Sequence, residues 1–137
     1  GTNRTYEIWI CPEALNIGWQ TWIDDGNERI LFGTNTNNIR VHPDVTINYT
    51  LQTRRWYQLV YTLEGSICRV YVNGVEQGTG TYSQSLRSGR QTIYIGGDTG
   101  SENSDMFFSI TRVYKRTLTA AEVLRNYNAD KADHGLT

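Results

Sequence analysis

Residues 54–80 read RRWYQLVYTLEGSICRVYVNGVEQGTG, and this stretch decides the fold of the chain. Its apolar residues alternate at the period of two that is typical of β-strands. Asn73-Gly74 is the strongest short hairpin signal in the sequence, because both residues tolerate the positive φ of a type I′ turn. The stretch therefore predicts three consecutive antiparallel strands, over residues 56–63, 66–72 and 75–79.

The strand over residues 56–63 is predicted to lie in the centre of a sheet, because both of its faces are largely apolar. One face carries Tyr57, Leu59, Tyr61 and Leu63. The other face carries Trp56, Gln58, Val60 and Thr62.

The C-terminal part of the chain predicts two more strands and a helix. Residues 92–95 form a short strand that stops at Gly96-Gly97, and residues 106–114 form a long final strand. Thr119 and Glu122 have the spacing of a capping box, in which each side chain satisfies a free amide at the start of a helix. The following helix should present Ala120, Val123, Leu124 and Tyr127 on one face.

The N-terminal half continues the rhythm of short strands and tight turns. Strands are expected at residues 4–10, 19–23, 28–32, 39–42 and 45–49, separated by turn residues such as those of the DDGN run at 24–27. Ten or eleven short strands with one helix do not make a βαβ pattern. The fold class is therefore all-β, a two-sheet antiparallel sandwich in which both sheets hide an apolar face. We expect the helix to lie across a sheet edge.

Length and charge limit the domain organisation and the partners. The 137 residues form one domain, 1–137, large enough for a hydrophobic core without metal or disulfide support. The net charge of −1 and the scattered arginines argue against nucleic acid as a partner. No apolar run is long enough for membrane insertion. Because the chain begins almost directly in a strand, we expect it to be part of a longer polypeptide.

Cys11 and Cys68, the two cysteines, are interpreted as buried reduced thiols, with one bridge between them as the alternative.

Several motifs in order resemble the concanavalin A-like, laminin-G-like jelly-roll family. They are Trp56-Tyr57-Gln58-Leu59-Val60, Gly65, Tyr71-Val72-Asn73-Gly74, Ile95-Gly96-Gly97 and Leu118-Thr119-Ala120-Ala121-Glu122-Val123, with Glu7-Ile8-Trp9-Ile10 as the opening strand. The resemblance covers residues 6–127 and implies a jelly-roll sandwich.

Within that family, the ends of bacteriophage structural proteins are similar to residues 122–129 and 133–136, and residues 19–33 have the same character. This resemblance implies a domain on the virion surface, with other virion subunits or glycans as partners. The expected N-terminal strand of the family is short here, so a neighbouring subunit or the rest of a longer chain could cover that sheet edge. We therefore expect a homo-oligomer.

The sequence predicts no catalytic residues. Jelly-roll glucanases place paired acids on one strand face, whereas the acids here fall mainly in turns. His42 lies beside Pro43 and His134 lies in the polar tail, so neither suggests a Ser-His-Asp arrangement.

Aromatic and amide side chains near the loops are candidates for a sugar site, because flat rings stack on sugars while amides and carboxylates bind hydroxyl groups. The candidate ligand-binding residues are Trp19, Trp22, Asn35, Asn37, Tyr82 and Asp98. Trp19 and Trp22 lie on opposite faces of a strand, so at least one of them is expected in the core.

No cofactor is required, but the family resemblance implies that Ca²⁺ can bind at a rim of the sandwich, through the oxygen ligands that this ion prefers. The candidate metal ligands are Asp24, Asp25, Asp98 and Asp105, with Glu102 nearby. The same acids are also what tight turns require.

Three functions follow as hypotheses. The first is a non-enzymatic, lectin-like domain of a viral structural protein, a surface decoration or fibre module that decorates or stabilises the particle or adheres to host glycans. The second is a purely structural assembly module. The third is an extracellular carbohydrate-binding module appended to a secreted hydrolase.

Overall fold

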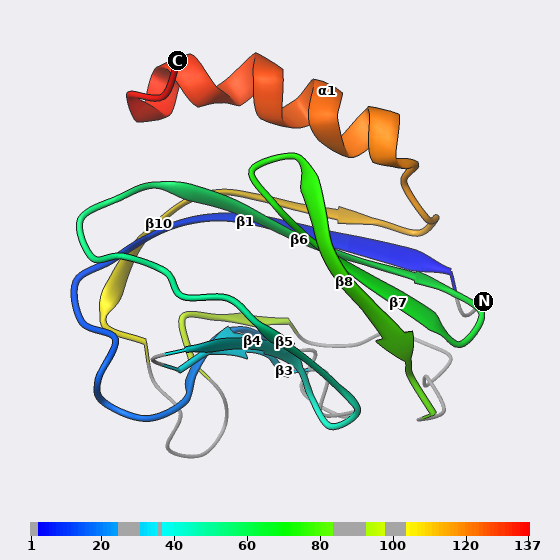
Figure 1. Cartoon of the computed structure of the whole chain (residues 1–137). Helices are drawn as coiled ribbons and strands as arrows, with labels where there is room; N and C mark the ends of the chain where they lie inside the picture. Colours follow the sequence, from blue (N-terminus) through cyan, green and yellow to red (C-terminus); the bar gives the residue numbers. More distant parts are fainter. Residues whose placement is uncertain (1–2, 25–30, 36, 84–92, 98–103) are drawn as a thin grey trace.

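A computed structural model shows a two-layer β-sandwich with one helix packed on the outside (Figure 1). The structure describes residues 3–24, 31–35, 37–83, 93–97 and 104–137. The predicted all-β class with two antiparallel sheets and one C-terminal helix is confirmed.

The first layer, sheet A, has the strand order β10-β1-β6-β7-β8. Its strands are β1 (Arg4–Pro12), β6 (Tyr57–Glu64), β7 (Ile67–Val72), β8 (Val75–Thr81) and β10 (Met106–Tyr114). All neighbours are antiparallel, and the strands of the deciding stretch lie next to one another, as short hairpin turns require. Strand β6 lies in the middle of the sheet, as its two apolar faces predicted.

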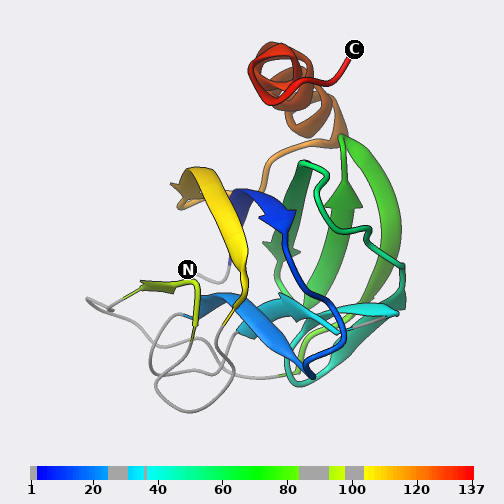
Figure 2. The same ribbon diagram turned by 90° about the vertical axis from the view of Figure 1, so that its left-hand side faces the viewer.

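The second layer, sheet B, has the strand order β5-β4-β3-β2-β9. Its strands are β2 (Gln20–Asp24), β3 (Leu31–Thr34), β4 (Asn38–Val41), β5 (Val45–Asn48) and β9 (Tyr94–Ile95). Figure 2 shows the two layers from the side, with helix α1 (Ala120–Asp130) beyond sheet A and the short 3₁₀ helix η1 (Lys131–His134) at its end.

The main core lies between the sheets. The β6 face that was predicted as apolar, with Tyr57, Leu59, Tyr61 and Leu63, lies in it. Across from these residues, sheet B contributes Ile39 and Val41 of β4 and Val45 and Ile47 of β5. Burial of apolar side chains between the layers is the main force that holds two sheets together.

Two glycines let the sheets approach closely at one side of the sandwich. A Cβ atom at Gly78 of β8 would collide with the side chain of Ile47, and one at Gly80 would lie 3.0 Å from Val45. Because β8 is an edge strand of sheet A and β5 an edge strand of sheet B, this contact closes the sandwich along that side.

The helix lies over the outer face of sheet A and not across a sheet edge, which corrects that expectation (Figure 1). The predicted capping box is confirmed: the Thr119 hydroxyl accepts a hydrogen bond from the Glu122 amide, and the Glu122 carboxylate accepts one from the Thr119 amide. Val123 is fully buried, whereas Leu124 of the predicted apolar face is 43% exposed. With eleven residues, α1 is too short to span a membrane, and the described part of the chain has no other helix suited to it.

Candidate ligand-binding face

The two outer faces of the sandwich differ in whether they are covered. On sheet A, the outward residues of β1 and β6 are completely buried, namely Thr5, Glu7, Trp9, Gln58, Val60 and Thr62. Helix α1 and the segment before it cover them, with Leu118 and Val123 packed on Val60 and Tyr71. The central part of this face is therefore not open to a ligand.

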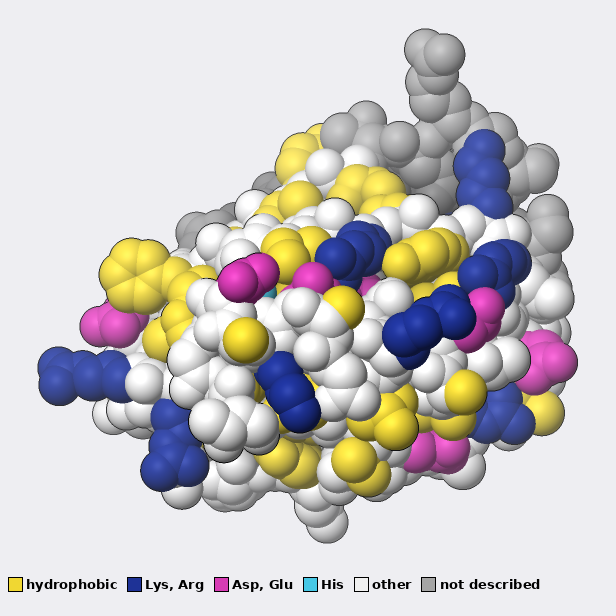
Figure 3. Space-filling model, turned by 90° about the horizontal axis from the view of Figure 1, so that it is seen from above, with side chains coloured by type: hydrophobic (Ala, Val, Ile, Leu, Met, Phe, Trp, Pro, Cys, Tyr) yellow, Lys and Arg dark blue, Asp and Glu magenta, His cyan; other side chains and the backbone are white. Residues whose placement is uncertain are grey.

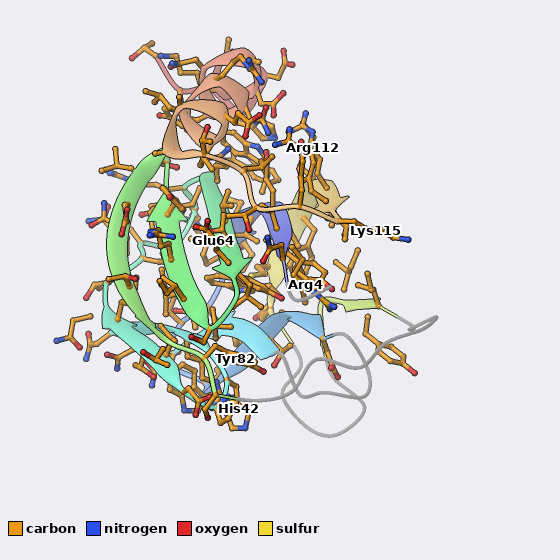
Figure 4. The ribbon with its side chains drawn as sticks, turned by 90° about the vertical axis from the view of Figure 1, so that its right-hand side faces the viewer. Arg4, His42, Glu64, Tyr82, Arg112 and Lys115 are labelled. Carbon is orange, nitrogen blue, oxygen red and sulfur yellow. The ribbon has the colours of Figure 1, made fainter. Side chains whose placement is uncertain are left out.

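A partly buried ion-pair network fixes the helix to sheet A. Arg112 of β10 donates to the Glu7 carboxylate at 2.6 Å and to the Asp130 carboxylate at 2.5 and 3.2 Å. Asn126 of α1 donates to Glu7 as well, at 2.9 Å. Figure 4 shows Arg112 beside the helix, whereas Lys115 extends away from it. Since the Glu7 side chain has no solvent exposure, these partners are what makes its burial tolerable.

The same network keeps the Arg112 guanidinium protonated. The hydrogen bond with Asp130, together with the charges of Glu7 and Asp130, raises the pKa of the Arg112 guanidinium above its ordinary value, against the effect of burial. The two carboxylates therefore face a permanent positive charge and hold the helix end in place.

An aromatic stack lies beside this network, at the C-terminal end of the cover. The His134 ring lies parallel to the Trp9 indole at 4.0 Å, and Trp56 meets His134 edge-on. His134 also contacts the Ser109 hydroxyl and the Asp130 carbonyl, both at 2.9 Å. Seen from this side, the surface mixes basic, acidic and hydrophobic side chains without a field of one charge (Figure 3).

Sheet B presents the opposite arrangement. Along β4 and β5 the buried residues alternate with partly or fully exposed residues that face outward. The outward residues are Asn38, Arg40, Thr46 and Asn48, and the pairs Asn38–Asn48 and Arg40–Thr46 stand opposite each other. This face therefore offers amides, a hydroxyl group and a guanidinium to solvent.

An aromatic ring joins this polar surface from the far side of β3. The guanidinium carbon of Arg40 lies 3.9 Å from the centre of the Trp19 ring, a cation–π contact. Trp19 immediately precedes β2, and β3 lies between β2 and β4, so the contact passes over β3. Gly33 of β3 pairs with Arg40 and has no side chain to block it. Only glycine fits there, because a Cβ atom would collide with the backbone oxygen of Gln20.

The turn between β3 and β4 completes this face, which we call the Trp19 face and define as Trp19, Asn37, Asn38, Arg40, Thr46 and Asn48. The Asn35 side-chain oxygen accepts hydrogen bonds from the amides of Asn37 and Asn38, which fixes the turn. Asn37 is exposed, and its side-chain oxygen accepts from Thr50 at 3.4 Å.

The candidate ligand residues separate into two groups. Trp19 is partly exposed and lies near Asn35 and Asn37, because Gln20 pairs with Thr34 at the adjoining ends of β2 and β3. Trp22 and Tyr82 are 0% and 3% exposed and pack in the main core, so they are removed from the candidate site. Asp98 lies outside the described residues.

The described residues do not assemble a metal site. Asp24 is 4% exposed at the end of β2, and Asp105 is exposed before β10, where its carbonyl accepts from the amides of Glu13 and Ala14. Within the described ranges no group of three or more His, Cys, Asp and Glu side chains could hold an ion. Asp25, Asp98 and Glu102 lie outside these ranges, so the calcium site stays a prediction.

The cysteines contribute no reactive group to the Trp19 face. Cys11 and Cys68 are both buried and are not joined to each other. Burial raises the pKa of the Cys68 thiol to about 12, so it stays protonated at neutral pH.

Arg40, Thr46 and Asn48 were not predicted from the sequence as residues of this face. The alternation of Ile39 and Val41 with Asn38 and Arg40 is visible in the sequence and could have indicated a polar outer face. The contact between Arg40 and Trp19 could not be inferred, because it depends on the order of strands in sheet B.

Solved structures with the same fold come from enzymes that act on carbohydrates, from a carbohydrate-binding protein and from other proteins. Domain 4 of AbnA, an extracellular arabinanase from Geobacillus stearothermophilus in complex with arabinotriose, has a TM-score of 0.73 at 18% identity, over 90% of this chain and 66% of that chain. A candidate carbohydrate binding protein from Bacteroides ovatus has a TM-score of 0.74 at 18% identity, over 90% of this chain and 40% of that one. The Trypanosoma rangeli sialidase has a TM-score of 0.72 at 17% identity, over 94% and 23%. This chain thus spans only part of each relative, and at these identities the likeness concerns the fold.

The sequence itself matches a family model. The model described as the concanavalin A-like lectin/glucanases superfamily covers residues 1–124, which include the ten strands of the described residues and the first half of helix α1. The chain belongs to the concanavalin A-like lectin/glucanases superfamily.

Proposed function

We propose that this chain is a non-catalytic carbohydrate-binding domain of a larger polypeptide, and that it binds glycans on the Trp19 face. One observation carries the proposal: the outward residues of β1 and β6 on sheet A are covered by the helix, whereas sheet B presents an indole, a guanidinium and amides outward.

The chemistry of the Trp19 face suits a ligand dense in hydroxyl groups. Asparagine side chains both donate and accept hydrogen bonds, as hydroxyl groups do, and an arginine donates in the plane of its guanidinium. Stacking on Trp19 fixes the orientation of Arg40 in advance, which lowers the entropy lost when a ligand binds. The flat indole adds an apolar surface for the carbon face of a sugar ring.

The relatives support this reading. The arabinanase domain was solved with arabinotriose, and the protein from Bacteroides ovatus is described as carbohydrate binding. In both cases the fold is shared with this chain. The third hypothesis drawn from the sequence, a carbohydrate-binding module attached to an enzyme, therefore has more support than the first.

The disposition of the carboxylates supports a non-catalytic role. A glycosidase needs two carboxyl groups facing one substrate. Here Glu7 and Asp130 do lie close together, but both are bound to Arg112 beneath helix α1, where a substrate has no access.

Affinity electrophoresis through gels that contain arabinan, xylan, cellulose derivatives or mannan tests the proposal. We expect one polysaccharide to retard the wild-type protein, and Trp19→Ala to abolish the retardation. Trp56→Ala is the matched control, because Trp56 is, like Trp19, a partly exposed tryptophan, and it lies against His134 on the sheet A side of the molecule. Equal losses for Trp19→Ala and Trp56→Ala, or no retardation on any gel and on a glycan array, would contradict the proposal.

Assembly is a second candidate function, favoured by the edge strands β9 and β10. These strands end the two sheets on the same side of the sandwich, where Gly96 lies against Phe108. Large apolar side chains are exposed along them, namely Tyr94, Ile95, Phe107 and Val113. Exposed apolar edge strands are templates for pairing with another chain.

Sedimentation equilibrium of wild type and Phe107→Asp tests assembly. We expect an oligomer that dissociates in the variant, and a wild-type monomer at all concentrations would refute it. The predicted place on a virion stays a prediction, which the coding sequence on either side of this domain would decide.

A further inference from the structure

Resting on the proposed function, we infer that the Trp19 face accepts a linear oligosaccharide of several units, laid across the strands of sheet B from β2 to β5. This inference names the class of ligand, a chain and not a single terminal sugar.

The register of sheet B places the binding groups in a line across the strands. Gln20 pairs with Thr34, so Trp19 lies at the level of Asn35. The Asn35 amide donates to the Asn38 carbonyl, and Asn38 stands opposite Asn48. Trp19, Asn38 and Asn48 thus mark one row that crosses four adjacent strands.

The neighbouring row runs parallel to it. Gly33, Arg40 and Thr46 stand opposite one another on β3, β4 and β5. Arg40 connects the two rows through its contact with Trp19. A ligand that follows the rows therefore meets the indole first, then the guanidinium and the Asn38 amide, and then Thr46 and Asn48.

The length of the rows decides the size of the ligand. Neighbouring strands lie about 4.8 Å apart, so the distance from β2 to β5 is about 14 Å. A single sugar ring reaches one or two strands at this spacing, whereas a short chain of sugars reaches all four. The full set of polar groups is therefore used only by an oligosaccharide.

The charge of the rows agrees with such a ligand. Arg40 is the charged residue among the described outward positions of β4 and β5, and the others are amides and a hydroxyl group. This set complements a chain with many hydroxyl oxygens along its length. Thr46 and Asn48 are exposed on β5, the last strand of the sheet in the described part of the chain, so a longer polysaccharide can continue past that edge.

Isothermal titration with arabino-, xylo- and cello-oligosaccharides of one to five units tests the inference. In at least one series we expect affinity to rise about tenfold or more between one and three units, an easily measured difference. Affinity should then level off once the chain spans β2 to β5.

Variants at the β5 end locate the ligand. Asn48→Ala should weaken binding of the trimer and longer chains several-fold and leave the affinity of the dimer unchanged, because the shorter ligand does not reach β5. Asn128→Ala, which removes an exposed asparagine of helix α1, is the matched control and should bind every length as wild type does.

The outcomes separate the two proposals. If the monosaccharide binds as tightly as the trimer, or if Asn48→Ala weakens every length equally, the crosswise chain is refuted while carbohydrate binding stands. If Trp19→Ala has no effect on any bound sugar, the Trp19 face is the wrong site and both proposals fall. Binding to none of the three series would also overturn the inference.

Discussion

The outer faces of the two sheets start from similar alternating strands and end in opposite states. On sheet A, a helix buries even a carboxylate and an amide, Glu7 and Gln58, at 0% exposure. On sheet B, the outward amides and hydroxyl groups of β4 and β5 stay in contact with solvent. Both faces carry a tryptophan and an arginine, but Trp9 and Arg112 hold the helix, whereas Trp19 and Arg40 face outward.

This difference shows that residue type alone does not assign a role on a sandwich. The same pair of side chains stabilises the fold where a helix covers it, and lies on the outer surface where no cover is described. The comparison therefore predicts that equivalent substitutions on the two faces have opposite consequences, one for stability and one for binding.

The two tryptophans provide the largest expected contrast. Trp9→Ala removes a fully buried indole and should lower the free energy of unfolding by about 3–5 kcal/mol. Trp19→Ala should lower it by no more than about 1 kcal/mol, since the ring and its cation–π contact are partly exposed. Urea unfolding followed by circular dichroism measures both. Similar losses for the two variants would show that the faces are not different in packing.

The two arginines give the next contrast. Arg112→Ala leaves the buried Glu7 carboxylate without its cation and should cost about 3 kcal/mol, the lower end for a buried pair because Arg112 itself is a third exposed. Arg40→Ala should cost under about 1 kcal/mol. Adding Glu7→Gln to Arg112→Ala should recover part of the loss, and no recovery would argue against an electrostatic cause.

A substitution in the helix cap tests how the helix covers sheet A, with a smaller expected effect on stability. Thr119→Ala removes the hydroxyl group that accepts from the Glu122 amide, and should cost about 1 kcal/mol in the same urea experiment. Thr119→Ser keeps the acceptor and should stay close to wild type. Glycan binding should be the same in both variants, because the cap lies on the opposite side of the molecule from the Trp19 face.

The smallest effect concerns pH. The hydrogen bond from Arg116, together with that from the Thr119 amide, lowers the pKa of Glu122 from 4.5 to about 2. A carboxyl group whose pKa falls on folding stabilises the protein above its unfolded value and loses this contribution as the pH drops through the folded one. Wild type should therefore exceed Glu122→Gln in melting temperature near pH 6, and the gap should shrink from pH 4.5 towards pH 2. Glu64→Gln is the control, because its contact with Arg69 is 3.5 Å long and exposed. A gap that does not change with pH would contradict the assignment.

Local patterns predicted the parts of the fold that local physics determines. The faces of β6 followed from strict alternation, and the start of α1 followed from the side chains of Thr119 and Glu122. Both signals lie within a few residues of the element that they describe.

The cover on sheet A was not predictable from the sequence because its contacts join distant residues. Glu7 and Arg112 are 105 positions apart, and Glu7 and Asn126 are 119 apart. The buried side of the helix also includes polar residues such as Asp130, which hydrophobic periodicity counts as exposed.

The positions of the candidate ligand residues in the structure differ from one another for a similar reason. A bulge between Thr21 and Ile23 shifts the register of β2, and both Trp22 and Ile23 face the core. Trp19 stayed outside, but its partner Arg40 lies two strands away. The residue types can indicate a candidate sugar site, whereas only the order of the strands shows which residues lie together in it.

The glycines of β8 also affect the position of the polar groups on the outer face of β5, which they do not contact. Ile47 rests in the space left by Gly78, and its neighbours in the chain are Thr46 and Asn48, whose side chains point the other way. Any side chain at position 78 would push β5 outward and move its polar groups with it. The absence of a side chain on the opposite layer thus sets the position of the β5 groups that we propose bind a polymer.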